Sequence, residues 1–150
     1  MRPPRPIPPP ILLLLLLVVS VLLTYLVPTP AISVPFHRPI ALLFVLAGVG
    51  CSASGFFTFK QIGTPVKPGA EPTQLVLKGP YRFTRNPMYL GLLLFSIGMF
   101  FAAQSLWFLI PPILFFLIIN FWLIPFEENF LRERFAKGYD DYCRQVRRWL

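Results

Sequence analysis

The sequence predicts an all-α protein, a polytopic membrane bundle of about four transmembrane helices followed by a cytoplasmic helical tail. Its composition is 55% hydrophobic and only 13% charged, which does not suit a water-soluble globule. Long apolar stretches recur along the chain, and a helix needs about 20 residues to cross about 30 Å of hydrocarbon. At 150 residues the chain is one domain by length.

Four apolar segments are the candidate spans. They are residues 11–27, 39–59, 88–103 and 106–126. The second and fourth have the length of a full span, whereas the first and third are short. Because little separates the third from the fourth, we expect a tight hairpin around Gln104 and Ser105.

The N-terminal segment allows two interpretations. Residues 1–10 are a proline-dense leader, expected to be extended, and residues 11–150 are one membrane domain with its motifs in 60–150. Arg2 and Arg5 before an apolar run also suit a signal peptide. The run is longer than a usual signal core and no small-x-small cleavage site follows it. We therefore expect it to remain as a membrane helix.

Basic residues set the expected orientation. If the N-terminus is cytoplasmic, thirteen of the fourteen Lys and Arg residues fall on the cytoplasmic side and only Arg38 lies outside. This asymmetry follows the positive-inside rule. We expect an integral membrane protein with both termini cytoplasmic, in the inner or plasma membrane if bacterial. The formal charge of +8 needs no nucleic acid, because anionic lipid headgroups account for it.

Cysteine and histidine usage argues against disulfide and metal chemistry. Cys51 lies within the second span and Cys143 in the tail, so a disulfide is not expected. The one histidine, His37, is predicted on the opposite face, which leaves no convincing set of zinc or iron ligands. The four spans as drawn contain no Asp, Glu, Lys or Arg, which disfavours an ion-coupled transporter.

Within the spans, two features predict local geometry. Small residues between Ala47 and Gly55 predict close helix packing. Pro111 and Pro112 predict a bend in the fourth span. Asn120 is the main polar residue deep in that span, and an interhelical hydrogen bond is the favoured role over a substrate contact.

The polar chemistry concentrates in two segments. Residues 79–91 read Gly-Pro-Tyr-Arg-Phe-Thr-Arg-Asn-Pro-Met-Tyr-Leu-Gly, and Glu127-Glu128 follows the fourth span. Taken alone, the first segment is explained by an interfacial anchor of Arg, Tyr and Pro. The carboxylate pair is expected near the negative pole of its helix dipole, where acids are disfavoured, and such a conflict is typical of a functional site. A solvated helix end paired with Arg132 is the alternative.

These motifs resemble a known family. Gly79-Pro-Tyr-Arg, Arg85-Asn-Pro-Met-Tyr-Leu-Gly91 and Glu127-Glu128, followed by residues 135–142 and 146–149, are similar to the isoprenylcysteine carboxyl methyltransferase and phospholipid methyltransferase superfamily. The resemblance covers roughly residues 60–150. It implies S-adenosylmethionine as methyl donor, held at the cytoplasmic end of a helical bundle, with the acceptor entering from the lipid.

The resemblance also implies a set of site residues. The family's Arg-His-Pro-x-Tyr-x-Gly has Asn86 in place of the histidine, and Asn cannot titrate as a base. Arg85 suits the donor carboxylate, and the two carboxylates suit its hydroxyls and amine. Tyr81 and Tyr89 suit its adenine or sulfonium. The expected cofactor-binding residues are Arg85, Asn86, Tyr89, Gly91, Glu127 and Glu128.

The expected function is thus a membrane methyltransferase acting on a small lipidic or membrane-embedded acceptor. A carboxylate acceptor needs no general base, since its charge and that of the sulfonium cancel. Arg147 and Arg148 are the candidate catalytic residues that hold an anionic acceptor, although attraction to lipid headgroups explains them equally well. An inactive scaffold or small transport protein, and a membrane reductase, are the alternatives. A homodimer that completes the pocket is a further expectation.

Overall fold

A computed structural model describes residues 7–30, 32–63 and 73–150. Each regular element in these ranges is a helix, which confirms the all-α fold class. The proline-rich start of the leader and residues 64–72 of the long loop, with Arg2, Arg5 and Lys67, lie outside the described residues. In order the elements are α1 (Pro9–Leu26), α2 (His37–Ile62), η1 (Gly79–Arg82), α3 (Pro87–Ala103), η2 (Leu106–Leu109), α4 (Ile110–Ile118), η3 (Ile119–Leu123), α5 (Ile124–Phe135) and α6 (Lys137–Gln145).

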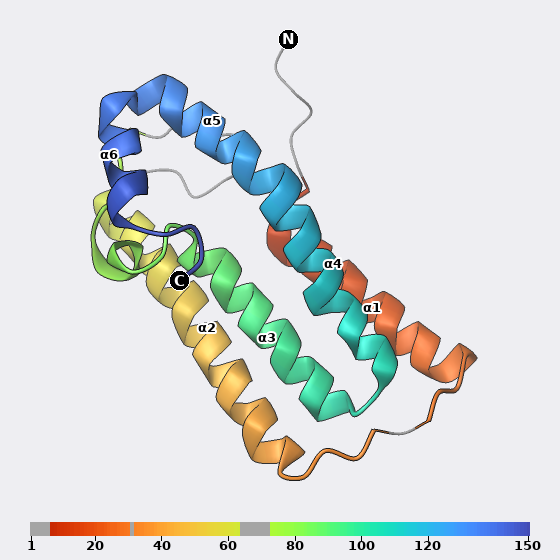
Figure 1. Cartoon of the computed structure of the whole chain (residues 1–150). Coiled ribbons are helices and arrows are strands. Elements are labelled where there is room, and N and C mark those ends of the chain that lie inside the picture. The colour runs from red at the N-terminus through yellow and green to blue at the C-terminus, as the bar shows by residue number, and fades with distance from the viewer. Residues whose placement is uncertain (1–6, 31, 64–72) are drawn as a thin grey trace.

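The predicted membrane bundle is confirmed, with one difference in length. Three helical segments are long and apolar enough to cross a membrane: Pro9–Leu26, His37–Ile62 and Leu106–Phe135. The third predicted span, α3, is a shorter apolar helix. It packs against α2 on one side and α4 on the other (Figure 1). The hairpin between α3 and α4 turns at Gln104, whose φ of 50° is left-handed.

The fourth span extends further than the sequence indicated. Helical backbone runs on from α4 through η3 and α5 to Phe135, so Glu127 and Glu128 lie inside a long helical segment. The expectation that the pair sits at a helix end, near the negative pole of the dipole, is therefore wrong. The apolar stretch of residues 106–126 itself contains no Asp, Glu, Lys or Arg, and the charged residues follow it within the same helical segment.

Pro111 and Pro112 do not kink this helix in its middle. Both are buried in the first turn of α4, just after the 3₁₀ turn η2. Proline fits there because the first turn has no intrahelical partner for its missing N–H. The irregular backbone lies further along, where η3 is a π-helical turn that contains Asn120. Single π turns inside α-helices are frequent at functional sites.

Close packing of α2 on α3 confirms the role predicted for the small residues. A Cβ built on Gly48 would lie 2.6 Å from the carbonyl oxygen of Gly91, and one on Gly91 would lie 2.5 Å from that of Gly48. The two backbones therefore touch at glycine. Ser52 Oγ donates to the carbonyl of Met88 at 3.0 Å, which fixes the register of the two helices.

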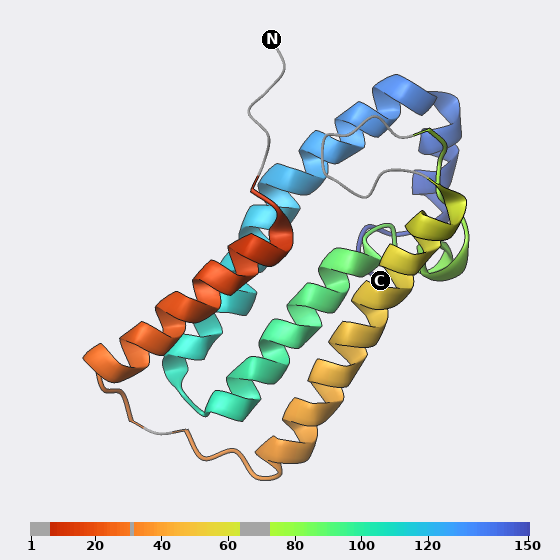
Figure 2. The same ribbon diagram turned by 180° about the vertical axis from the view of Figure 1, so that it is seen from behind.

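Helix α1 covers the other side of α3 and packs mainly on α4. Its Leu13 is buried with Phe115, Ile119, Leu123 and Ile124 in the main hydrophobic core. Seen from behind, α3 lies between α1 and α2 (Figure 2). At the far end of the bundle Thr24 and Ser105 join α1 to the α3–α4 turn by a 3.0 Å hydrogen bond.

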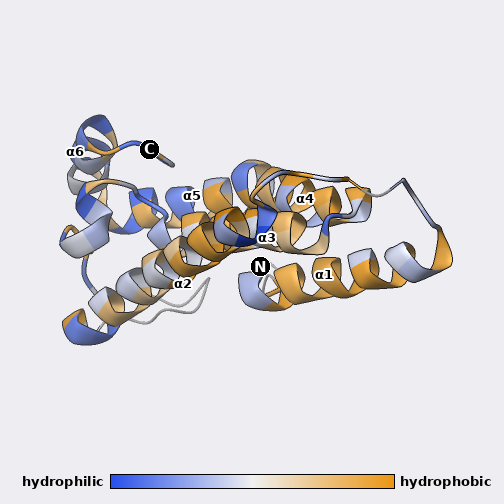
Figure 3. Ribbon diagram, turned by 90° about the horizontal axis from the view of Figure 1, so that it is seen from below, coloured by the Kyte–Doolittle hydropathy of each residue, from blue (hydrophilic) through white to orange (hydrophobic). Residues whose placement is uncertain are grey.

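Polar residues gather at one end of the molecule. Much of the helical ribbon is coloured orange, and many of the blue segments lie around α6 and the adjoining ends of α2 and α5, with others near the α3 and α4 labels (Figure 3). Arg38 belongs to the start of α2, at the opposite end. The side of the membrane on which each end lies stays a prediction.

Candidate functional site

The loop before α3 is built on a left-handed glycine. Gly79 has a φ of 60°, and a Cβ there would lie 2.9 Å from Thr58 Oγ1 of α2, so glycine allows both the turn and the close approach. Pro80 follows as the second residue of η1. This turn brings the ring of Tyr81 against Phe59, with ring centroids 5.2 Å apart.

The start of α3 connects this loop to the carboxylates of α5. Pro87 occupies the first turn of α3, and Asn86 precedes it at the N-cap position. Tyr89 lies in that turn, and its hydroxyl donates to Glu127 Oε1 at 2.8 Å. The two chain-distant polar segments therefore meet.

Glu128 lies beside Glu127 in sequence but binds quite different groups. Its Oε1 lies 3.2 Å from an Arg85 guanidinium nitrogen, and Arg148 donates to both carboxylate oxygens at 2.7 and 3.1 Å. The Glu128 side chain is 11% exposed and that of Arg85 is 13% exposed. Bidentate arginine pairs of this kind are strong and geometrically specific.

The C-terminal segment, residues 146–150, is held by hydrogen bonds from residues 84–86 of the loop before α3. Arg85 N–H donates to the carbonyl of Arg147 at 3.0 Å, and Asn86 Nδ2 donates to that of Arg148 at 2.9 Å. Thr84 Oγ1 donates to the same Arg148 carbonyl at 3.2 Å. Asn86 thus holds the tail through its amide, and Arg147 takes part through its backbone while its side chain is exposed.

The side chain of Asn120, a polar residue deep in the fourth span, is hydrogen-bonded as predicted. Its side-chain oxygen accepts from Trp149 Nε1 at 2.9 Å and from Arg148 at 3.3 Å. The predicted structural bond is present, but it joins the π turn to the C-terminal segment instead of to a neighbouring helix. The ring of Trp149 also packs on Phe116, with centroids 5.3 Å apart.

Gly91 lies apart from this cluster. It is buried between α2 and α3, where a side chain would meet Gly48 and Ser52. Among the predicted site residues, Arg85, Asn86, Tyr89, Glu127, Glu128 and Arg148 come together, and Gly91 and the Arg147 side chain do not. Arg132, the alternative partner of the carboxylates, instead pairs with Asp140 at 3.0 Å.

Sequence reasoning assigned no role to three residues of this region. Thr84 and Trp149 anchor the C-terminal segment, and Cys143 accepts a hydrogen bond from Arg85. Both cysteines are free. Two signals were available: Thr84 lies two residues before Asn86, and Trp149 belongs to the motif at residues 146–149. The backbone N–H of Asn86 donates to Thr84 Oγ1 at 3.2 Å.

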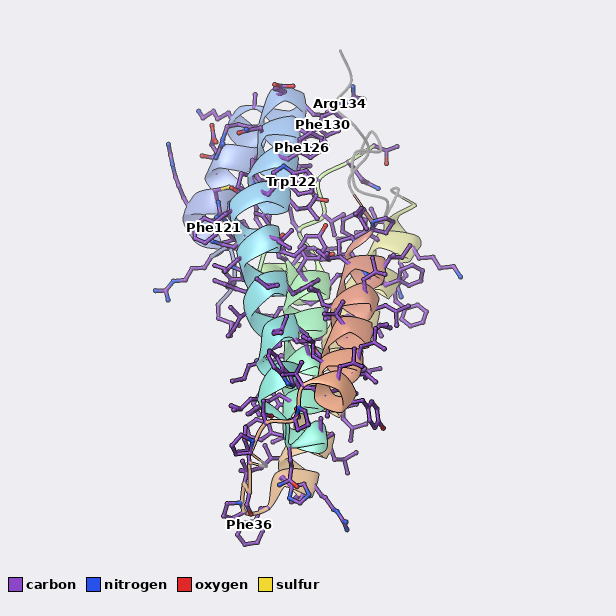
Figure 4. The ribbon with its side chains drawn as sticks, turned by 90° about the vertical axis from the view of Figure 1, so that its right-hand side faces the viewer. Phe36, Phe121, Trp122, Phe126, Phe130 and Arg134 are labelled. Atoms are coloured by element: carbon purple, nitrogen blue, oxygen red, sulfur yellow. The ribbon has the colours of Figure 1, made fainter. Side chains whose placement is uncertain are left out.

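An aromatic face continues along η3 and α5 past the carboxylates. Trp122, Phe126, Phe130 and Arg134 recur every four residues and project from one side, whereas Phe121 points elsewhere (Figure 4). Trp122 and Phe121 are exposed. Exposed Trp and other aromatic residues near the polar end of an apolar helix are typical of the boundary between lipid and water.

An apolar groove has walls from α1 and α2 and a floor from α3. Its volume is about 580 Å³, within the usual range of ligand pockets. Leu13 and Leu17 of α1, Phe56 of α2, and Leu92 and Phe95 of α3 are among its lining residues. Leu92, which lines the groove, lies one helical turn along α3 from Tyr89.

Comparison with known proteins decides the family. The model of the phospholipid methyltransferase family matches residues 36–138, which is α2 through the start of α6. The chain belongs to the phospholipid methyltransferase family. The match includes α2, so the family region begins earlier than the sequence motifs indicated, and it excludes α1 and the C-terminal segment. Neither a curated protein nor a solved structure matches the chain significantly.

Membership of this family indicates the general class of the protein. It is a membrane methyltransferase family whose enzymes generally use S-adenosylmethionine. Together with the apolar helices, it identifies an integral membrane protein.

Proposed function

We propose that the protein is a membrane methyltransferase that binds S-adenosylmethionine at the polar cluster and methylates a lipidic or membrane-embedded acceptor. The observation that carries the proposal is the Tyr89–Glu127 bond, which joins the Arg-Asn-Pro-x-Tyr segment of α3 to the carboxylate pair of α5. Family membership supports the reaction class, and the cluster supports the place where it occurs.

The residues of the cluster fit the chemistry of the donor. Glu127 uses Oε1 for Tyr89 and makes no other hydrogen bond within the described residues, so its second oxygen can accept from an amine or a ribose hydroxyl. Arg85 Nε is buried and has no partner among those residues. A buried guanidinium N–H of this kind suits a carboxylate. Phenol rings nearby suit a sulfonium.

Glu128 fits a supporting role better than direct contact. Its two oxygens already bind Arg85 and Arg148, and that pairing holds Arg85 in place. We therefore assign Glu127 to the donor and Glu128 to the orientation of the two arginines. Arg148, bound to Glu128 and Asn120, is the arginine placed to meet an anionic acceptor group.

The groove supports a lipidic acceptor. Ser52 is the polar residue in the lining of the groove. Its hydroxyl already donates to the carbonyl of Met88, so the surface that the groove presents is apolar. Burial of a hydrocarbon chain there contributes about 0.8 kcal/mol per methylene. Such a chain beside Leu92 would place its polar end near Tyr89. The family's description names phospholipids, which have this amphipathic shape.

Chain residues contribute alignment and exclusion of water. The bound donor supplies an electrophilic methyl group. Tyr89 and Glu127 hold it in a fixed orientation at the end of the apolar groove, and alignment of this kind accounts for a large share of the rate enhancement in two-substrate reactions. Asn86 cannot act as a base, so an acceptor that is already deprotonated suits this site.

Donor titration of wild type and Glu127→Gln by calorimetry tests the assignment. Gln keeps the size and an acceptor for Tyr89, but it removes the charge that attracts the donor's cationic groups. We expect the Kd to rise about tenfold or more, equivalent to about 1.4 kcal/mol. Arg144→Gln, an exposed tail variant, is the control and should bind as wild type. Equal affinity in wild type and Glu127→Gln would reject Glu127 as a ligand.

A further inference from the structure

The apolar groove runs through one half of the bundle, toward the end that carries the polar cluster. Along α1 its lining extends from Pro10 to Leu17, and along α2 from Gly48 to Phe57. With a rise of about 1.5 Å per residue, these stretches are about 10–14 Å long. Half of a hydrocarbon core of about 30 Å is of similar depth. The groove therefore corresponds to a single leaflet, the one on the side of the cluster.

The two walls of the groove are helices that pack mainly on other elements. Helix α1 packs mainly on α4, α2 packs mainly on α3, and α3 lies between the two walls (Figure 2). Four large apolar side chains of the lining are exposed: Leu14, Val49, Phe56 and Phe57. Both wall helices are apolar enough to cross a membrane, so this surface faces the bilayer. A lipid chain can thus enter the groove sideways, between α1 and α2.

The walls and the floor come together at the inner end of the groove. Leu17 of α1 and Phe95 of α3 both pack against the main hydrophobic core. Gly48 of α2 lies against the backbone of α3, because a Cβ built on it would be 2.6 Å from the nitrogen of Phe95. Contacts among the three helices therefore limit the groove at this level.

Tyr89 relates the groove to the proposed donor site. Its ring packs on the same hydrophobic core as the groove residues Leu92 and Phe95, and its hydroxyl binds Glu127. A lipid with its chain in the groove has its headgroup at the polar end of the bundle, the end that carries the cluster. Its chain then extends away from the reacting group, toward the inner end.

We propose that the groove holds one hydrocarbon chain of the lipid acceptor and selects it by length, with α1 as the specificity-determining wall. The inference rests on the proposed function and states which lipids that function prefers. A chain that reaches the inner end makes the most apolar contact, and a longer one must leave the groove. Helix α1 lies outside residues 36–138 that match the family, so this selection comes from a helix outside the family region.

Tryptophan substitutions at two exposed lining positions test the inference. Val49→Trp fills the inner end from α2, and Leu14→Trp narrows the groove from α1. Purified protein is given labelled S-adenosylmethionine and a membrane lipid extract of mixed chain lengths, and mass spectrometry reads the chain length of each labelled lipid. We expect the ratio of long-chain to short-chain products to fall about tenfold, because one methylene in an apolar pocket already changes specificity about tenfold or more.

Leu15→Trp and Leu43→Trp are the matched controls. Both leucines are exposed, and they lie on other faces of α1 and α2 than Leu14 and Val49. They should keep the wild-type ratio of products. The melting temperature and the donor Kd of each variant, measured in detergent on the same samples, should equal those of wild type, since all four positions are exposed.

The outcomes separate the inference from the proposed function. If wild type labels lipids and the two lining variants keep its product ratio, or lose all chain lengths equally, the groove does not select the chain and the inference is wrong while the proposed function stands. The same holds if the controls shift the ratio as much. An unchanged ratio with loss of a dimer in the lining variants would show that a second copy covers the groove. If wild type binds the donor but labels no lipid, the lipidic acceptor itself fails, and the inference fails with it.

Discussion

Single residues in the cluster have separable roles. Glu127 and Glu128 are adjacent in sequence, yet one accepts from a phenol and the other from two guanidinium groups. The sequence predicted the carboxylate pair as a unit. Adjacent side chains on a helix point in different directions. Glu127 therefore meets Tyr89 of α3, whereas Glu128 meets Arg85 and Arg148.

At this scale we predict that the two carboxylates contribute unequally to stability. Glu128→Gln leaves Arg85 and Arg148 without their counter-charge in a mostly buried place, and we expect a loss of about 3 kcal/mol of stability. Glu127→Gln still accepts from Tyr89 and should cost much less. Thermal or chemical unfolding in detergent measures both. Equal stability of the two variants would contradict the assigned roles.

Among the secondary-structure elements, the sequence predicted those that depend on local pattern. The long apolar runs were predicted correctly, and the third predicted span, residues 88–103, differs from α3 by one residue at its start. The end of the fourth span was not, because two consecutive glutamates look like solvent-exposed residues until their partners are known. The π turn around Asn120 has no sequence signal of its own. The pairing of the C-terminal segment with residues 84–86 is a tertiary contact across the chain, so no local pattern predicts it.

The contact between α2 and α3 gives a prediction about an element. Gly48→Ala should destabilise the protein, because the added methyl group would lie 2.6 Å from backbone atoms of α3. Gly50→Ala is the matched control in the same helix, with open space around the position. Alanine favours helix there, so stability should be unchanged or slightly higher. Equal melting temperatures for the two variants would show that the close contact does not matter.

On the scale of the whole molecule, charge and hydropathy give the bundle two distinct ends. The cluster and α6 share one end, and the positive-inside rule predicts that this end is cytoplasmic. Family membership and the apolar helices agree with an integral membrane enzyme. They leave the orientation to experiment.

Cysteine accessibility in intact cells tests the orientation. In a background with Cys51 and Cys143 replaced by serine, single cysteines at Gly138 and at Ser33 mark the two ends, and both positions are exposed. We expect an impermeant thiol reagent to label only Ser33→Cys before lysis and both variants after it. Labelling of Gly138→Cys alone in intact cells would reverse the proposed topology.

Transfer of an isotopically labelled methyl group tests the central claim most directly. Purified protein is incubated with labelled S-adenosylmethionine and a membrane lipid extract, and the lipid fraction is analysed by mass spectrometry. The proposed function predicts labelled lipid with wild type and much less with Glu127→Gln at the same donor concentration. Absence of labelled lipid with wild type, in a sample that is folded and binds the donor, would contradict a lipidic acceptor. Absence of both transfer and donor binding would contradict the methyltransferase assignment itself.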